Sequence, residues 1–261
     1  MGGRWLDLSG RGLTELPDED WAGIERLDLD RNRFTRFPEL LTRATRLRHL
    51  SLYANELDAV PESLWELTEL RVLNLAGNRL TEISPSIGRL SFVHTLDLGH
   101  NRLTALPDEL GSLPNLTEYL YLSDNQLTTF PESLCRLGKL RYLGFTDNQL
   151  TSLPESIGGL ASLRELRLYH NELGSLPESI GDLTALRELH LRGNRITRLP
   201  RSIGELGELR QLDLRDNGLT ELPGELAGLS KLDKLDLRWN KHLALPAWLP
   251  DLEARGCLVL L

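Results

Sequence analysis

The repeating unit that decides the fold is clearest where the chain reads LHLRGNRITRLPRSIGEL, residues 189–206. Leucine alternates with other residues over the first positions, which is typical of a short strand with one buried face. The asparagine that follows can hydrogen-bond backbone groups at a turn. The later Leu-Pro and Ile-Gly positions indicate an irregular or 3₁₀ return segment. One such unit cannot bury its own leucines, whereas a stack of copies can.

Copies of this unit fill the chain. Asparagine recurs every 23 residues, with a single step of 24, and each asparagine follows the same leucine frame. The positions are Asn32, Asn55, Asn78, Asn101, Asn125, Asn148, Asn171, Asn194, Asn217 and Asn240. Arg11 takes the asparagine place in a shorter first copy, and residues 258–260 begin a last copy. Self-similarity at this period is the signature of a solenoid, here with twelve expected strands.

In these motifs the chain resembles leucine-rich repeat proteins of the typical 23-residue class, over about residues 5–260. It is similar to intracellular Ras-suppressor and scaffold-type members, including the plant Ras-group proteins, and to bacterial members. The resemblance implies an α/β, right-handed solenoid. A curved parallel sheet of about twelve short strands lines its concave face, and 3₁₀ or irregular segments form its convex face.

We expect a single domain over residues 1–261. It consists of a degenerate N-terminal repeat (1–26), regular repeats (27–245) and a C-terminal capping half-repeat (246–261). Proline stands one place late at Pro85, so that return segment is expected to differ locally. The 24-residue step carries one inserted residue, which we place at or before Tyr119 as a bulge.

Composition excludes several classes of protein. Leucine makes up 64 of 261 residues, yet the chain has no run of 18 apolar residues that could cross a membrane. Thirteen prolines and 22 glycines, spread along the chain, exclude a long coiled coil. The formal net charge of −8 argues against nucleic acid or an anionic membrane as the main partner.

The two cysteines bear on the compartment. Cys135 and Cys257 lie five repeats apart, which at about 4.8 Å per strand separates them by roughly 24 Å. A disulfide needs Cα atoms within about 7 Å, so we expect two free thiols and a reducing compartment. The sequence also begins without an apolar signal segment. We therefore expect a cytoplasmic protein, with delivery into a host cell as the alternative.

The variable positions of the predicted strands indicate where a partner binds. Side chains six, four and two places before each asparagine are expected to face the concave surface, and those one place before it the rim. All five tyrosines fall in these positions: Tyr53, Tyr119, Tyr121, Tyr142 and Tyr169. Tyrosine is enriched at interfaces, although strands favour it even without a partner.

Charge is sorted along the predicted arc. Arg192, Arg215 and Arg238 form one column toward the C-terminal end, with Arg167 beside it, and four aspartates lie toward the N-terminal end (Asp7, Asp28, Asp30 and Asp97). The arginines suit a carboxylate-bearing protein surface. Asp213 and Asp236 occupy the neighbouring column, so neutral pairing within the face is the alternative.

These observations give a predicted partner-binding set on the concave face. Its members are Tyr53, Tyr119, Tyr121, Tyr142, Tyr169, Arg167, His190, Arg192, Arg215, Arg238 and Trp239. We expect a protein partner, no nucleic acid and no membrane, for a chain that is a monomer, with a homodimer left open.

Catalysis is not expected. His190 and Asp213 are predicted neighbours about 5 Å apart at Cα, but no nucleophile stands in the adjacent columns, so we expect a surface ion pair. His170 and His190 lie about 10 Å apart along the strand direction, too far for one metal ion. The chain carries no phosphate-binding loop and no zinc spacing. We expect neither metal nor cofactor.

The function expected is therefore a protein-interaction module or scaffold. One alternative is a bacterial effector acting on a host protein, and another is a structural or engineered scaffold without a natural ligand. The late proline and the 24-residue step favour a natural, diverged array over an engineered one.

Overall fold

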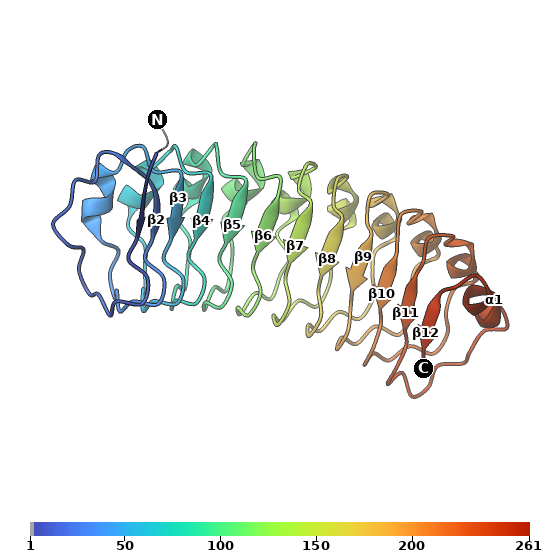
Figure 1. The fold of residues 1–261 in the computed structure, drawn as a ribbon. Coiled ribbons are helices and arrows are strands. Elements are labelled where there is room, and N and C mark those ends of the chain that lie inside the picture. The colour runs from blue at the N-terminus through green and yellow to red at the C-terminus, as the bar shows by residue number, and fades with distance from the viewer. Residues whose placement is uncertain (1–2) are drawn as a thin grey trace. The chain divides into compact units, whose positions relative to one another are not determined.

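The computed structural model of this protein describes residues 3–261 and shows strands alternating with short 3₁₀ helices (Figure 1). The chain divides into two compact units. Unit 1 ends at Gln126, and unit 2 runs from Leu127 to Leu261.

Unit 1, over residues 3–126, has six strands and four 3₁₀ helices. The strands are β1 (Arg4–Asp7), β2 (Ile24–Asp28), β3 (His49–Ser51), β4 (Val72–Asn74), β5 (Thr95–Asp97) and β6 (Tyr119–Tyr121). The 3₁₀ helices are η1 (Glu39–Arg43), η2 (Glu62–Glu66), η3 (Pro85–Arg89) and η4 (Asp108–Ser112).

Unit 2, over residues 127–261, has six strands, five 3₁₀ helices and one α-helix. The strands are β7 (Tyr142–Gly144), β8 (Glu165–Arg167), β9 (Glu188–His190), β10 (Gln211–Asp213), β11 (Lys234–Asp236) and β12 (Leu258–Leu260). The helices are η5 (Glu132–Arg136), η6 (Glu155–Gly159), η7 (Glu178–Asp182), η8 (Arg201–Glu205), η9 (Gly224–Gly228) and α1 (Leu249–Ala254).

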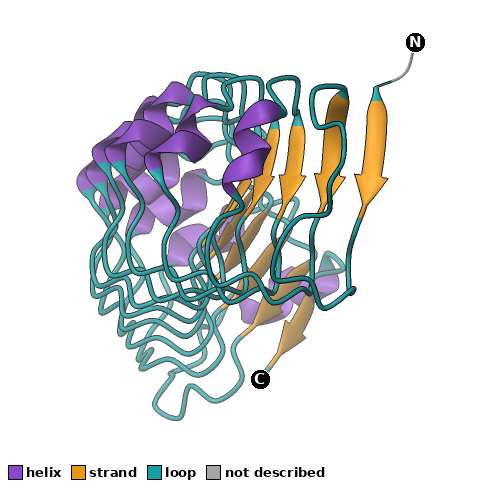
Figure 2. Cartoon of the chain, turned by 90° about the vertical axis from the view of Figure 1, so that its left-hand side faces the viewer, coloured by secondary structure: helices purple, strands orange, loops and turns teal. Residues whose placement is uncertain are grey.

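Within each unit the strands pair in parallel and in chain order. The pairing advances by one repeat per strand, so that Leu166 lies beside Leu189 and Leu189 beside Leu212. Figure 2 shows the strands on one side and the helices on the other, joined by loops. The expected solenoid of short parallel strands is confirmed, with twelve strands over residues 3–261.

The core of each unit is made of leucines from successive repeats. In the repeat of β8, Leu166, Leu168, Ile157 and Leu163 are all fully buried. Each repeat presents these side chains to the next, so the apolar surface that one repeat leaves uncovered is buried by its neighbour.

Buried asparagines tie consecutive repeats together. The Nδ2 of Asn171 donates to the carbonyl oxygens of Leu168 in its own repeat (3.0 Å) and of Phe145 in the preceding one (2.9 Å). Its Oδ1 accepts from the N–H of Leu150 at 2.9 Å. Asn78 of unit 1 makes the same three bonds, each at 3.0 Å. The predicted asparagine ladder is confirmed in both units.

The two irregular copies are accommodated outside the strands. Helix η3 has five residues, like η1, η2 and η4, and Ser84 stands where the others have proline, accepting from the N–H of Ser86 at 3.2 Å. The expected difference at Pro85 is therefore confined to the cap. The extra residue precedes Tyr119, and β5 and β6 pair in regular register, so the strand itself has no bulge.

Both cysteines are free, as predicted, and both are buried, which raises the pKa of each thiol. Buried thiols of this kind behave as small apolar side chains. Over residues 3–261, no helix is both long enough and apolar enough to span a bilayer.

Candidate interaction surface

In the repeat of Asn171, the side chains six, four and two places before the asparagine lie on the side of the strand away from the leucine core, as predicted. In β8 and the residues after it, Glu165, Arg167 and Tyr169 are half-buried, whereas Leu166 and Leu168 between them are fully buried. This alternation follows from the pleat of a strand, whose successive side chains point to opposite faces. We call the outward positions the strand face.

The tyrosines of unit 1 lie on this face. Tyr53 is half-buried, and Tyr119 is 43% exposed. The ring of Tyr119 stacks on that of Tyr121 with centroids 5.7 Å apart and planes within 5°. Two stacked phenol rings at the surface offer apolar area together with hydroxyl groups.

The carboxylate of Asp28 in unit 1 contacts three different side chains. Asp28 accepts from the indole Nε1 of Trp5 at 2.9 Å and from the Nε of Arg26 at 3.2 Å. Its other carboxylate oxygen lies 3.2 Å from Nε2 of His49. Burial, together with the charge of Arg26, lowers the pKa of His49 despite this carboxylate.

Asp30 and Asp97 of unit 1 each accept a hydrogen bond from a backbone N–H group. Asp30 accepts from the N–H of Tyr53 at 3.0 Å and from the hydroxyl of Ser51. Asp97 accepts from the N–H of Gly99 at 3.0 Å. Burial raises the pKa of Asp97, because the ionised form is poorly solvated there.

In unit 2 the first tyrosine of the predicted set is largely covered. Tyr142 is 9% exposed, and the guanidinium of Arg167 lies 5.5 Å from the centre of its ring. Arg167 also donates from Nε to Glu165 at 2.5 Å. Burial works to lower the pKa of Arg167, but the hydrogen bond to Glu165 and the electrostatic effects of Glu165, Tyr142 and Tyr169 together outweigh burial, so the pKa is raised.

Two arginines of the predicted column are neutralised within the face. Arg215 binds Asp213 through two parallel bonds, at 2.8 and 2.5 Å, and lies 3.4 Å from Asp236. Arg238 binds Asp236 at 2.9 and 2.7 Å. Burial would raise the pKa of Asp236, which is 1% exposed, but hydrogen bonds from Arg238 hold it below its usual value. The alternative of neutral pairing is confirmed for these two arginines.

Arg192 differs from its column neighbours. Its guanidinium lies 5.6 Å from the centre of the Trp239 ring, and that of Arg238 lies 5.8 Å from the same ring. The Nε of Arg192 is buried and has no hydrogen-bond acceptor among residues 3–261. Trp239 is 57% exposed. The two side chains together form a cationic and aromatic surface.

The expected ion pair between His190 and Asp213 is wrong. These residues are neighbours in the register of β9 and β10, but Asp213 binds Arg215 instead. The Nε2 of His190 lies 3.2 Å from Glu188 and 4.0 Å from Glu165. Both glutamates stand six places before an asparagine. Residues at the same place in consecutive repeats lie side by side, so the sequence could have predicted that Glu165 and Glu188 are neighbours.

The rings beside His190 are arranged edge to face. Tyr169 lies 6.5 Å from the ring of His190 and 5.5 Å from that of His170, both near a right angle. His170 is held by Asp147, with Nδ1 2.8 Å from the carboxylate. The two histidines therefore have separate acidic partners.

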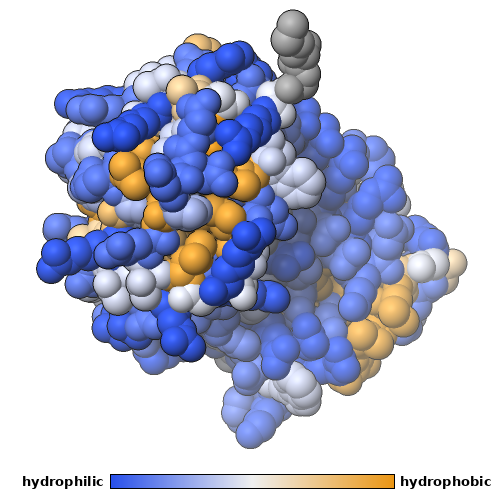
Figure 3. All heavy atoms as spheres, turned by 60° about the vertical axis from the view of Figure 1, so that its left-hand side comes forward, coloured by the Kyte–Doolittle hydropathy of each residue, from blue (hydrophilic) through white to orange (hydrophobic). Residues whose placement is uncertain are grey.

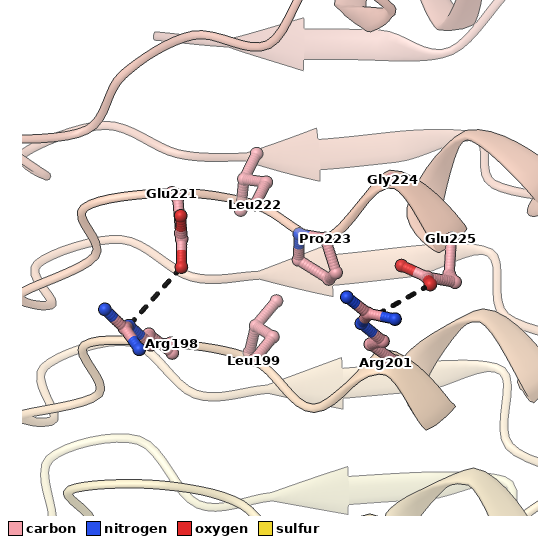
Figure 4. Close-up of a pocket in the computed structure, with 8 residues that line it drawn as sticks. All are labelled: Arg198, Leu199, Arg201, Glu221, Leu222, Pro223, Gly224 and Glu225. Carbon is pink, nitrogen blue, oxygen red and sulfur yellow. Dashed lines mark ion pairs between the residues drawn. The ribbon is translucent and has the colours of Figure 1, made fainter.

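Two pockets lie away from the strand face. One of about 580 Å³ lies between the repeats of η8 and η9, where Arg198 pairs with Glu221 at 3.3 Å and Arg201 with Glu225 at 3.8 Å (Figure 4). Figure 3 shows hydrophobic residues gathered on the part of unit 1 that faces the viewer. A pocket of about 460 Å³ in unit 1 is lined in part by Leu16, Phe37 and Leu40.

Family models for leucine-rich repeats match most of the chain. A model described as "Leucine-rich repeat region" matches residues 120–192 and 178–255. "Leucine rich repeat" matches residues 22–80, and "Leucine Rich repeats (2 copies)" matches 68–108 and 91–135. No curated protein matches the chain by sequence.

Solved structures of leucine-rich repeat proteins are similar to this chain. A leucine-rich repeat protein of Leptospira interrogans is 30% identical with a TM-score of 0.69, over 95% of this chain and 75% of that protein. The plant peptide hormone receptor RGFR1, solved in complex with RGF2, is 29% identical with a TM-score of 0.76 over 91% of this chain. An internalin from Listeria monocytogenes, 24% identical with a TM-score of 0.71, covers 81% of this chain and shares the fold. The chain spans 38% of the plant receptor and 60% of the internalin.

Proposed function

Because the chain belongs to the leucine-rich repeat family, we propose that it is a non-enzymatic protein-binding module whose strand face in unit 2 holds a partner. The plant relative was solved with a peptide hormone bound, which supports a peptide or protein as the ligand class. Short strands hold their side chains at fixed spacing, so little ordering entropy is lost on binding.

The observation that carries this proposal is the surface made by Arg192 and Trp239. Arg215 and Arg238 are already neutralised by aspartates, whereas Arg192 lies against the indole, and its buried Nε has no acceptor in the part of the chain that the structure describes. An incoming carboxylate can accept from a guanidinium, and an apolar side chain next to it can pack on the exposed indole. We therefore propose a protein segment that carries an Asp or Glu beside an apolar residue.

Tyr169 belongs to the same surface. It occupies the position two places before its asparagine, as Arg192 does in the next repeat, and it is half-buried. The other members of the predicted set remain predictions as contact residues. They are Tyr53, Tyr119, Tyr121, Tyr142, Arg167, His190, Arg215 and Arg238. The cytoplasmic location likewise stays a prediction.

The test is affinity capture with the full chain from a lysate of the source organism, read by mass spectrometry. The wild type runs beside an Arg192→Ala/Trp239→Ala variant and beside an Arg198→Ala control that removes an exposed ion pair elsewhere. We expect one protein to be bound by the wild type and the control, and its affinity to fall at least about 10-fold in the double variant.

Equal affinity for all three proteins would contradict the assignment of the site. An effector acting on a host protein would use the same surface but find its partner only in a host lysate. Failure to capture a protein from either lysate would contradict the module itself.

A further inference from the structure

Two glutamates and one histidine converge on the strand face of unit 2. Glu165 lies on β8, and Glu188 and His190 lie on β9. The register places Glu165 directly beside Glu188, and Arg167 directly beside His190. All three side chains are half-buried, with exposures of 23%, 35% and 17% in that order.

The distances within this group are those of a ligand set. The Nε2 of His190 lies 3.2 Å from Glu188 Oε2 and 4.0 Å from Glu165 Oε1. One ligand atom from each residue can be chosen so that all three lie within 4.8 Å of one another. A tetrahedral cation bonded to all three at about 2.0–2.2 Å holds its ligand atoms about 3.3–3.6 Å apart, so Glu188 already suits His190 and the Glu165 carboxylate has to move about 0.5 Å closer.

Charge within the group favours an added cation. Two carboxylates directly beside each other on neighbouring strands repel. Arg167 binds Glu165 and offsets one of the two negative charges. The hydrogen bond uses one lone pair of Oε1, the oxygen that lies 4.0 Å from His190, so the other lone pair of Oε1 and the second carboxylate oxygen remain for a metal ion.

The donor types select the class of cation. Carboxylate oxygens with one imidazole nitrogen suit Zn²⁺ and similar first-row transition metals, whereas Ca²⁺ and Mg²⁺ prefer oxygen alone. The ring of Tyr169 stands edge-on to His190 with centroids 6.5 Å apart, which limits how far the imidazole can turn. The half-buried setting weakens competition from bulk water.

We propose that Glu165, Glu188 and His190 form a binding site for a divalent transition metal of the Zn²⁺ type, with water completing the coordination. The proposal departs from the expectation, based on the separation of His170 from His190, that the chain holds no metal ion. It does not rest on the proposed partner, because all three ligands come from this chain.

Isothermal titration of the chelator-treated full chain with zinc chloride at pH 7 tests the site. We expect one strong site in the wild type, and an affinity at least about 10-fold weaker in His190→Ala. Glu188→Gln keeps the size of the side chain and should weaken binding in the same direction. Arg167→Gln removes the competing guanidinium, so it should tighten binding.

The matched control is His170→Ala. His170 lies beside Tyr169 as His190 does, but its acidic partner is Asp147 alone among residues 3–261. Its replacement should leave zinc affinity unchanged. Binding of Co²⁺ supplies a second readout, because a visible absorption band from a nitrogen and oxygen ligand set should be lost in His190→Ala.

Three results would overturn the proposal. These are the absence of zinc binding by the wild type, equal binding by His190→Ala and the wild type, and equal loss in His190→Ala and His170→Ala. The last result would indicate scattered surface histidines instead of one site. Circular dichroism tests whether each variant is folded. If His190→Ala does not fold, the zinc affinity of Glu188→Gln tests the site in its place.

Discussion

In unit 1 the carboxylate of Asp97 accepts a hydrogen bond from the backbone N–H of Gly99, whereas in unit 2 Asp236 is held by the guanidinium groups of Arg215 and Arg238. The two residues stand at the same place in their repeats, four before the asparagine. Burial raises the pKa of Asp97, but hydrogen bonds from Arg238 overcome burial at Asp236 and lower its pKa. The comparison teaches that the repeat determines where an acid stands, and that the residues around it determine the direction in which its pKa shifts.

The largest expected effect concerns a feature that the units share. Asn78→Ala in unit 1 and Asn171→Ala in unit 2 each remove three buried hydrogen bonds. Buried backbone groups then lose their partners, so each variant should lose about 3 kcal/mol or more of unfolding free energy. Urea unfolding followed by circular dichroism measures both.

The control for this pair is Asn115→Ala, because Asn115 is an exposed asparagine with a single bond to the carbonyl of Ser91. It should change stability little. If the losses of unfolding free energy in Asn78→Ala and Asn171→Ala differed by several kcal/mol, the buried asparagines would not stabilise the two units equally. The acids of the two units could then not be compared as residues in equivalent repeats.

The second effect separates the units. Asp236→Asn leaves Arg215 and Arg238 without the charge that they bind, so we expect a loss of about 2 kcal/mol at pH 7. Because the folded-state pKa of Asp236 is lowered, its contribution is present above the unfolded value near 3.8 and is lost as the pH falls below it. Thermal unfolding of the variant and the wild type between pH 3 and pH 7 tests this.

Asp233→Asn is the matched variant, since Asp233 forms an exposed ion pair with Arg210 at 3.3 Å. Its effect should be small at every pH. A stability difference between Asp236→Asn and the wild type that did not shrink toward pH 3 would show that the charge of Asp236 is not what stabilises unit 2.

The third effect has the opposite sign. Asp97→Asn keeps an oxygen to accept from Gly99 but removes a poorly solvated charge, so it should stabilise the chain by up to about 1 kcal/mol at pH 7. The folded-state pKa of Asp97 is raised, so wild-type stability from this group is greatest at low pH and falls as the pH rises through that pKa. The melting temperatures of variant and wild type should therefore converge on acidification. If Asp97→Asn melted at a lower temperature than the wild type at pH 7, the proposed difference between Asp97 and Asp236 would be wrong.

The smallest effect comes from an exposed ion pair outside the strand face. Arg198→Ala breaks the ion pair with Glu221. The side chains of Arg198 and Glu221 are 75% and 65% exposed. Exposed pairs contribute at most about 1 kcal/mol, and we expect less than about 0.5 kcal/mol here. A larger shift in the melting temperature would mean that charge pairs stabilise this chain wherever they lie, not only when they are buried.

Much of the interaction surface could be predicted from the sequence. The spacing of leucines and asparagines placed Glu165, Arg167 and Tyr169 outward, because the pleat of a strand permits only two faces. The pairing of Asp213 with Arg215 was foreseen as an alternative, since both lie in neighbouring columns. The contacts made by the ends of long side chains could not be predicted in this way.

His190 illustrates the limit. Its Cα lies beside that of Asp213, but its ring turns to Glu188 and Glu165, whereas Arg215 binds both carboxylate oxygens of Asp213. Tyr142 similarly occupies an outward position and yet is 9% exposed, with Arg167 lying over its ring. Competition among several charged neighbours cannot be ranked from spacing alone.

The sequence by itself determined the repeat, the twelve strands, the asparagine ladder and which side chains point outward. These follow from local geometry and from the need of each repeat to bury its leucines against the next. Only the tertiary structure decided which partner each charged side chain takes. Among residues 3–261, Arg215 and Arg238 have carboxylate partners and Arg192 has none, and two glutamates meet His190. These choices depend on rotamers and on distances of a few ångströms, over which electrostatic interactions change most steeply.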